Sequence, residues 1–153
     1  MEDNIKLDAK VIVKSLAPWV TGAKRILSVG DIAIQPKGTA TITREELIAQ
    51  AQSGNKLLTG IDGKGSHATW YVEDEYVRKE LEFDEGTKKQ DILTTEIIKK
   101  MFELKTISAF EKNLKENVQT RAEKVFLMET IKELKLNDYD KITACTQYTG
   151  NKL

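Results

Sequence analysis

Residues 55–75 read NKLLTGIDGKGSHATWYVEDE, and the rest of the chain is organised around this stretch. It holds three of the nine glycines, the only histidine and one of the two tryptophans of the 153-residue sequence. Glycines between apolar segments are typical of tight loops, because glycine adopts backbone angles that other residues avoid. We therefore expect an exposed hairpin loop over residues 60–67, called the glycine loop below, followed by a strand over 68–72.

Two ligand-binding interpretations of the glycine loop fail on spacing. A phosphate-binding loop needs Gly-Lys-Ser/Thr at the start of a helix, whereas Gly65 separates Lys64 from Ser66 here and a strand is predicted to follow. Asp62 and Glu73 have the separation of the first and last ligands of an EF-hand. Lysine stands at the third position, however, and no glycine stands at the sixth. The sequence predicts no cofactor and no metal site.

No set of residues has the types and spacing of a catalytic site. His67 needs a nucleophile or an orienting carboxylate to act as a general base, and the sequence assigns neither, although Asp62 and Glu73 are close in the chain. Cys145, the sole cysteine, excludes an internal disulfide and lies on an apolar helical stripe, where a packed and unreactive thiol is expected. An enzyme is therefore the weakest hypothesis.

Upstream of the glycine loop the sequence predicts mainly β structure. Strands are expected over residues 10–14, 25–29, 31–35 and 39–42, with a turn at 20–22 and a hairpin joining the last two strands. Thr43 and Glu46 fit a capping box for a helix that Gly54 ends. Residues 1–9 are expected to be a weakly structured polar arm. Trp19 follows a proline, a position where tryptophan caps one end of a core or anchors a partner.

Downstream the hydrophobic period changes to that of a helix. Gly86 is the predicted boundary, and helices are expected over about 90–104, 107–117, 120–136 and from 139 to just before Gly150. Thr120 and Glu123 form a second capping box, and the helix they open should be the most buried. The predicted class is α+β: a polar arm (1–9), a β-rich part with one capped helix (10–86), and a part of three or four helices (87–153).

Composition and charge exclude several classes of protein. Lys plus Arg and Asp plus Glu number 24 each, so no net positive charge is available to bind phosphate backbones. The first residues lack the basic start and apolar run of a signal peptide, and no apolar run is long enough to span a bilayer. We expect a soluble protein made in the cytoplasm, with no membrane partner.

Four segments resemble small virion proteins of tailed bacteriophages in style and order: residues 16–22 (LAPWVTG), 30–36 (GDIAIQP), 42–47 (ITREEL) and 136–142 (LNDYDKI). The resemblance implies a non-enzymatic structural or assembly subunit of the capsid, head-tail connector or tail. It also implies location in the virion, synthesis in the bacterial host cytoplasm, and partners that are copies of itself and other virion proteins. It transfers no catalytic residue.

On this interpretation the chain works through repeated protein contacts. The candidate contact residues are Trp19, Gly60, Asp62, Gly63, Lys64, Gly65, Ser66 and His67. The alternative is a nucleic-acid-associated protein, supported by the dipeptides Lys88-Lys89 and Lys99-Lys100 but not favoured by the neutral charge.

Overall fold

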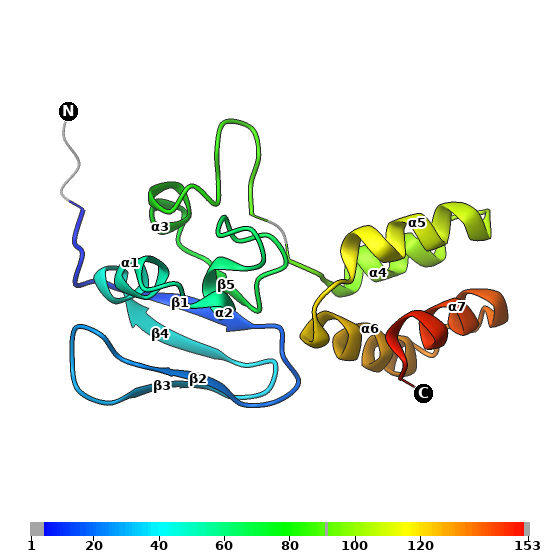
Figure 1. Cartoon of the computed structure of the whole chain (residues 1–153), viewed down its shortest axis with the longest axis horizontal. Helices are drawn as coiled ribbons and strands as arrows, with labels where there is room; N and C mark the ends of the chain where they lie inside the picture. Colours follow the sequence, from blue (N-terminus) through cyan, green and yellow to red (C-terminus); the bar gives the residue numbers. More distant parts are fainter. Residues whose placement is uncertain (1–4, 91, 152–153) are drawn as a thin grey trace. The chain divides into compact units, whose positions relative to one another are not determined.

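The computed structural model describes residues 5–90 and 92–151, and Figure 1 shows its elements. Contacts divide the chain into two units, Met1–Ile92 and Leu93–Leu153. The predicted α+β class is confirmed, because antiparallel strands dominate the first part and helices form the second. Within the described part, no helix combines the length and apolar character needed to cross a bilayer.

The larger sheet of the first unit has the order β4-β1-β5. Its central strand β1 (Lys10–Ser15) pairs antiparallel with β4 (Thr39–Thr43) on one side and with β5 (Trp70–Val72) on the other. Side chains alternate along a strand, so Val13 of β1 is fully buried while its neighbour Ile12 is 46% exposed. One face of this sheet therefore points into the core.

A second sheet consists of β2 (Thr21–Lys24) and β3 (Asp31–Ile34), which run beside β4 in Figure 1. The strand predicted over 25–29 is wrong, because these residues form the turn between β2 and β3. The turn predicted at 20–22 is also wrong, because β2 begins there. The predicted hairpin of β3 with β4 does not form, since β3 pairs with β2 and β4 pairs with β1.

Tertiary contacts explain why sequence patterns did not predict β2. Its residues, Thr-Gly-Ala-Lys, lack the β-branched alternation of a typical strand. The hydroxyl of Thr21 accepts a hydrogen bond from Trp70 Nε1 at 2.7 Å, and the carbonyl of Lys24 accepts one from Gln50 Nε2 at 2.8 Å. Both ends of the strand are thus held by residues far away in the sequence.

Three helices of the first unit are short: α1 (Arg44–Gln52), α2 (Lys56–Thr59) and α3 (Glu75–Glu80). The predicted capping box of α1 is half correct. The Thr43 side chain accepts from the Glu46 amide at 3.2 Å, as expected. The Glu46 carboxylate bonds instead to the turn between β2 and β3, as described below.

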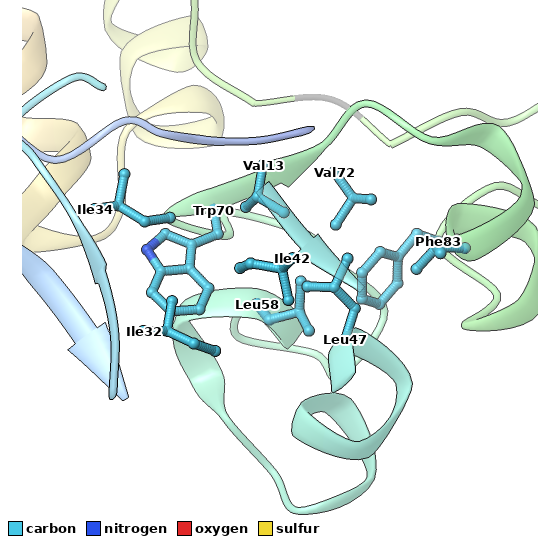
Figure 2. Packing of buried hydrophobic residues seen from close by; sticks show 10 residues of the cluster. Val13, Ile32, Ile34, Ile42, Leu47, Leu58, Trp70, Val72 and Phe83 are labelled. Atoms are coloured by element: carbon cyan, nitrogen blue, oxygen red, sulfur yellow. The ribbon is translucent and has the colours of Figure 1, made fainter. Parts of the chain in front are cut away.

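The core of the first unit combines side chains from both sheets, the helices and the segment after α3. In Figure 2, Trp70 lies against Ile32 and Ile34 at one end of the cluster, while Phe83 lies near Leu47 at the other. Trp70, Phe83, Ile34 and Leu47 are all 0% exposed. Aromatic side chains bury the largest apolar areas. Trp70 packs β5 against β3, and Phe83 packs the segment after α3 against α1.

Residues 5–9 correct the expectation of a weakly structured arm. The carbonyls of Leu7 and Ala9 accept hydrogen bonds from the amides of Glu45 (2.8 Å) and Arg44 (3.0 Å). Helix N-termini leave amides without intrahelical partners, and these two find them in the preceding chain. The first four residues of the predicted arm lie outside the described residues.

The described residues of the second unit form four helices: α4 (Thr95–Phe102), α5 (Ile107–Asn117), α6 (Arg121–Leu134) and α7 (Tyr139–Thr149). The predicted helical part is confirmed, although α4 begins about five residues later than predicted because Thr94 caps it. Both halves of the Thr120–Glu123 capping box are present. As expected, α6 has more buried residues than its neighbours.

A buried lysine joins two of these helices. Lys141 is 8% exposed, and its ammonium group donates to the carbonyls of Phe102 (2.7 Å) and Leu104 (2.6 Å) at the end of α4. Cations are favourable at helix C-termini, where carbonyl groups lack intrahelical donors. The ring of Phe110 packs edge-on against Phe102 with centroids 5.1 Å apart. The start of α7 is therefore fixed to the end of α4.

Candidate protein-contact surfaces

The glycine loop is closed by hydrogen bonds within itself and to α2. The Asp62 carboxylate accepts from the backbone amides of Lys64 (2.8 Å) and Ser66 (3.2 Å), and the Gly65 amide donates to the Thr59 carbonyl at 2.7 Å. Burial acts to raise the pKa of Asp62, but the hydrogen bonds from Ser66 and Lys64 outweigh it, and the pKa lies below its usual value. Asp62 is thus an ionised acceptor that fixes the loop conformation.

Gly65 marks the point where the glycine loop meets residues 83–90. Its φ is +83°, and an added Cβ would lie 2.7 Å from Gln90 Nε2 and 2.9 Å from Phe83 Cγ. The side-chain amide of Gln90 donates to the Gly65 carbonyl at 3.2 Å. Both the backbone angle and the close approach require glycine here. The loop is exposed at residues 61–64, as expected, but it packs at Gly65 and joins α2 to β5 instead of connecting two strands of a hairpin.

A buried ion pair fastens the following segment to β5. Arg78 donates from Nε to Asp84 at 2.9 Å and from a guanidinium nitrogen to the Val72 carbonyl at 2.8 Å. Asp84 also accepts a hydrogen bond from the backbone amide of Gln90 at 2.7 Å. Burial acts to raise the pKa of Asp84, but the bonds from Gln90 and Arg78 lower it below its usual value. Arg78 thus gives the Val72 carbonyl on the edge strand β5 a hydrogen-bond partner.

The same contacts explain where the first unit ends. Gly86 was the predicted boundary, yet the chain stays bonded to the first unit as far as Gln90, and the division falls after Ile92. Gln90 Oε1 is the one buried side-chain polar atom without a hydrogen-bond partner in the described ranges.

The structure separates the predicted contact residues into two places. Trp19 lies half-buried in the connection between β1 and β2, whereas the other seven belong to the glycine loop. Gly60 and Gly65 are buried, residues 61–64 are exposed, and Ser66 and His67 are half-buried. A contact role for these residues stays a prediction.

Chemically reactive groups are few in the described ranges. No group of three His, Cys, Asp or Glu side chains in residues 5–90 and 92–151 is placed to hold a metal ion. The Cys145 thiol is 0% exposed, and burial raises its pKa to about 12. A thiol with this pKa is protonated at neutral pH and is a poor nucleophile.

Sequence patterns missed the most exposed apolar surface of the first unit, the turn between β2 and β3. We call residues 25–30 the hairpin tip. Ile26 is 46% exposed, Leu27 is 55% exposed and Val29 is 99% exposed. The turn is closed by a hydrogen bond of 2.9 Å from the Arg25 amide to the Gly30 carbonyl, and Gly30 has φ +113°. Contiguous exposed apolar patches mark binding surfaces, and these three residues stand within four positions of one turn.

The hairpin tip is held by a buried carboxylate. Glu46 of α1 is 2% exposed, and its oxygens accept from the amides of Ile26 (2.9 Å) and Leu27 (3.0 Å). Gln50 Nε2 donates to the same carboxylate at 2.8 Å. Burial acts to raise the pKa of Glu46, but these hydrogen bonds and the charge of Arg25 outweigh it, so its pKa is lowered. The tip therefore presents its side chains from a fixed backbone.

Charges around the hairpin tip cancel. Lys24 faces Asp31 across the β2–β3 pair, and Arg25 interacts electrostatically with Glu46. Cross-strand pairs of opposite charge are mildly favourable. The projection is thus apolar and close to neutral, unlike the basic surfaces that bind phosphate backbones or anionic lipids. One signal could have revealed it: a strand-like run that ends at glycine directly before another strand.

The second unit has an open groove of mixed polarity between α4 and α5. Its volume is about 260 Å³, and it is lined by Ile97, Lys100, Met101, Leu104, Asn113 and Asn117. The side-chain amides of Asn113 and Asn117 donate to carbonyls of α5 itself, at 3.1 Å and 2.9 Å. We call this surface the α4–α5 groove.

Comparisons with protein-family models, with curated proteins and with solved structures give no match for this chain.

Proposed function

We propose that this chain is a non-enzymatic structural or assembly subunit of a phage particle and that the hairpin tip is its main contact. The observation that carries the proposal is the exposed aliphatic trio of Ile26, Leu27 and Val29 on a backbone fixed by Glu46. A fixed apolar projection gains affinity because binding need not order it first. The phage setting and the location in the virion come from the sequence resemblance.

A protein partner fits the tip better than the alternatives. Apolar side chains at a neutral surface gain free energy when another apolar surface covers them, by roughly 25 cal/mol per Å². A nucleic-acid partner would instead require a cluster of cations, and Lys24 and Arg25 are each opposed by a carboxylate. Copies of the chain and other virion proteins are therefore the proposed partners.

Incorporation into particles tests the proposal. Val29→Asp and the double variant Ile26→Ser/Leu27→Ser should fold with unchanged circular dichroism, because these side chains are exposed. Both should be lost from particles purified by density gradient from cells that make the whole virion. Val20→Ser is the matched control, because Val20 is 55% exposed but lies outside the tip. Wild-type amounts of both tip variants in the particles would refute the proposal.

A further inference from the structure

We propose that the hairpin tip and the glycine loop are coupled through three polar side chains, so that ordering of one surface orders the other. These side chains are Glu46 and Gln50 of α1 and Asn55, which precedes α2, and we call them the polar relay. This inference rests on the proposed function and concerns the regulation of the same surface. The coupling itself belongs to the folded first unit and needs no partner to be measured.

Gln50 is the centre of the polar relay. It is 2% exposed, and its Nε2 donates to the Glu46 carboxylate and to the Lys24 carbonyl, both at 2.8 Å. Its Oε1 accepts a hydrogen bond from Asn55 Nδ2 at 2.9 Å. Both donors and the oxygen of this amide are therefore used, and an inverted amide would place oxygen against oxygen and nitrogen against nitrogen. Glu46 thus determines the orientation of Gln50, and Gln50 determines that of Asn55.

Asn55 passes this orientation to α2. Because its side-chain nitrogen is directed to Gln50, its side-chain oxygen faces the Leu57 amide, accepts from it at 3.1 Å and caps the helix. A helix of only four residues has no stability of its own in water, because so few hydrogen bonds do not offset the cost of nucleation. Helix α2 therefore depends on this cap, and it is the element that changes between an ordered and a frayed state.

The last residue of α2 holds the glycine loop. The Thr59 carbonyl accepts from the Gly65 amide at 2.7 Å, and the Thr59 hydroxyl donates to the Asn55 carbonyl at 3.2 Å. Fraying of α2 displaces Thr59, so Gly65 loses the acceptor that closes the loop. The polar relay thus reaches the glycine loop through one turn of helix.

The hairpin tip lies at the other end of the polar relay. Its Ile26 and Leu27 amides share the Glu46 carboxylate with Gln50. A partner that immobilises the tip holds these amides in place, and the side chains of Glu46 and Gln50 with them. Less conformational entropy is then lost when α2 and the glycine loop become ordered, which couples the two surfaces without a change of shape. Coupling free energies are reciprocal, so a contact at residues 61–64 also orders the tip.

Amide hydrogen exchange in the full-length protein tests the coupling when one end is changed and the other is measured. Asn55→Ala should accelerate exchange of the Ile26 and Leu27 amides by about five-fold or more, the lower end of common coupling effects. Glu46→Gln replaces one carboxylate oxygen by a donor, so it should accelerate exchange of the Gly65 amide by a similar factor.

Two further variants separate the polar relay from a general loss of stability. Val13→Ala is the matched control, because it weakens the core but removes no side-chain hydrogen bond. It should leave exchange at both ends unchanged, since these amides exchange through local opening. Gln50→Leu keeps a similar volume but interrupts the polar relay. In that background Asn55→Ala should no longer accelerate exchange at the hairpin tip.

The outcomes decide the inference separately from the proposed function. Exchange at the far end no faster than in Val13→Ala, for both Asn55→Ala and Glu46→Gln, overturns the coupling, even if Gln50→Leu does not fold. Effects at the far end that persist with Gln50→Leu overturn the route through the polar relay. Val29→Asp entering particles normally refutes the proposed function but leaves the coupling, which is measured on the isolated protein.

Discussion

At the scale of single residues, Glu46 connects a buried helix to an exposed surface. Its carboxylate bonds to two turn amides and to Gln50, so one side chain sets the conformation of the hairpin tip. The capping-box pattern predicts a different partner for Glu46, the backbone amide of Thr43 at the N-terminus of its own helix. The capping pattern is local, whereas the turn that takes the carboxylate lies about twenty residues upstream.

Replacement of Glu46 by alanine should lower the free energy of unfolding by about 1–3 kcal/mol, because the amides of Ile26 and Leu27 lose their acceptor. Urea unfolding measures the change, and amide hydrogen exchange at residues 26 and 27 should accelerate. Glu45→Ala is the control: its exposed side chain should matter by less than about 0.5 kcal/mol. Equal effects of the two substitutions would contradict the role of Glu46.

The Glu46 contribution should also depend on pH. Its pKa is lowered in the folded protein, so the stability it supplies is fully present above the unfolded pKa of about 4.3 and is lost as pH falls through the lower folded value. The stability difference between the wild type and Glu46→Ala should therefore shrink between pH 7 and pH 3. A difference that stays constant over this range would show that the charge of Glu46 is irrelevant.

Cys145 gives a second prediction at this scale. Its thiol is buried and its pKa is raised to about 12, so a thiol reagent at pH 8 should react only after unfolding. Cys145→Ala should keep the fold and lose about 1 kcal/mol through weaker packing. Rapid labelling in native buffer would show that α7 opens readily.

At the scale of elements, the sequence predicted best where local chemistry determines the structure. The capping box of Thr120 and Glu123 and the apolar period of α6 lie within one helix, and both were predicted correctly. Strand β2 was not predicted because Thr21 and Lys24 are held by Trp70 and Gln50, which lie too far away in the sequence for a local pattern to include them. The hairpin tip was missed for the same reason, because it exists only once β2 has paired with β3.

The hairpin tip became visible only when β2 was paired with β3. From the sequence, its aliphatic residues were indistinguishable from a buried strand, because a run of apolar residues carries no information about exposure. The glycine loop was predicted in part. Its residues 61–64 are exposed as expected, but the packing of Gly65 against Gln90 and Phe83 involves residues about twenty positions away, which a local glycine pattern does not reveal.

Two glycines of that loop provide a matched prediction. Gly65→Ala should be strongly destabilising, because its Cβ would lie under 3 Å from Gln90 and Phe83 and its φ is +83°. Gly63→Ala has a similar φ of +78° but no atom within 4 Å, so its effect should be limited to backbone strain of about 1 kcal/mol. Thermal unfolding of both variants measures the difference. Equal losses would show that the loop does not pack on residues 83–90.

The link between α7 and α4 can be tested in the same way. Lys141→Met keeps the aliphatic stem but leaves the carbonyls of Phe102 and Leu104 without their donor, so stability should fall by about 1–3 kcal/mol. The control is Lys132→Met, at an exposed position of α6. A larger loss for Lys132→Met than for Lys141→Met would contradict the assignment.

At the scale of the whole molecule, the chain consists of two compact units. The first unit joins strands distant in sequence, and the second packs helices that are close in sequence. Local contacts form faster than distant ones because less chain entropy is lost. The helical unit should therefore fold earlier than the sheet unit.

Separate fragments should show the two units independently. Residues 93–153 should give a predominantly helical circular dichroism spectrum, with modest stability because small domains bury a small share of their surface. Residues 1–92 should give a mixed spectrum with strand signal and, after Trp19→Phe, Trp70 fluorescence that is shielded from quenchers. Predominant strand signal from 93–153, or an unfolded 1–92 fragment with exposed Trp70, would contradict this division.

Because Glu46 supports the hairpin tip through backbone amides, the side chains that the tip presents to a partner can be exchanged. The carboxylate binds main-chain amides, so this contact does not depend on which side chains stand at positions 26 and 27. A foreign peptide can be grafted between Lys24 and Asp31, provided that glycine is kept at position 30. One scaffold can therefore display many peptides, and a descendant of this chain can change its partner by a few surface substitutions without having to evolve a new fold.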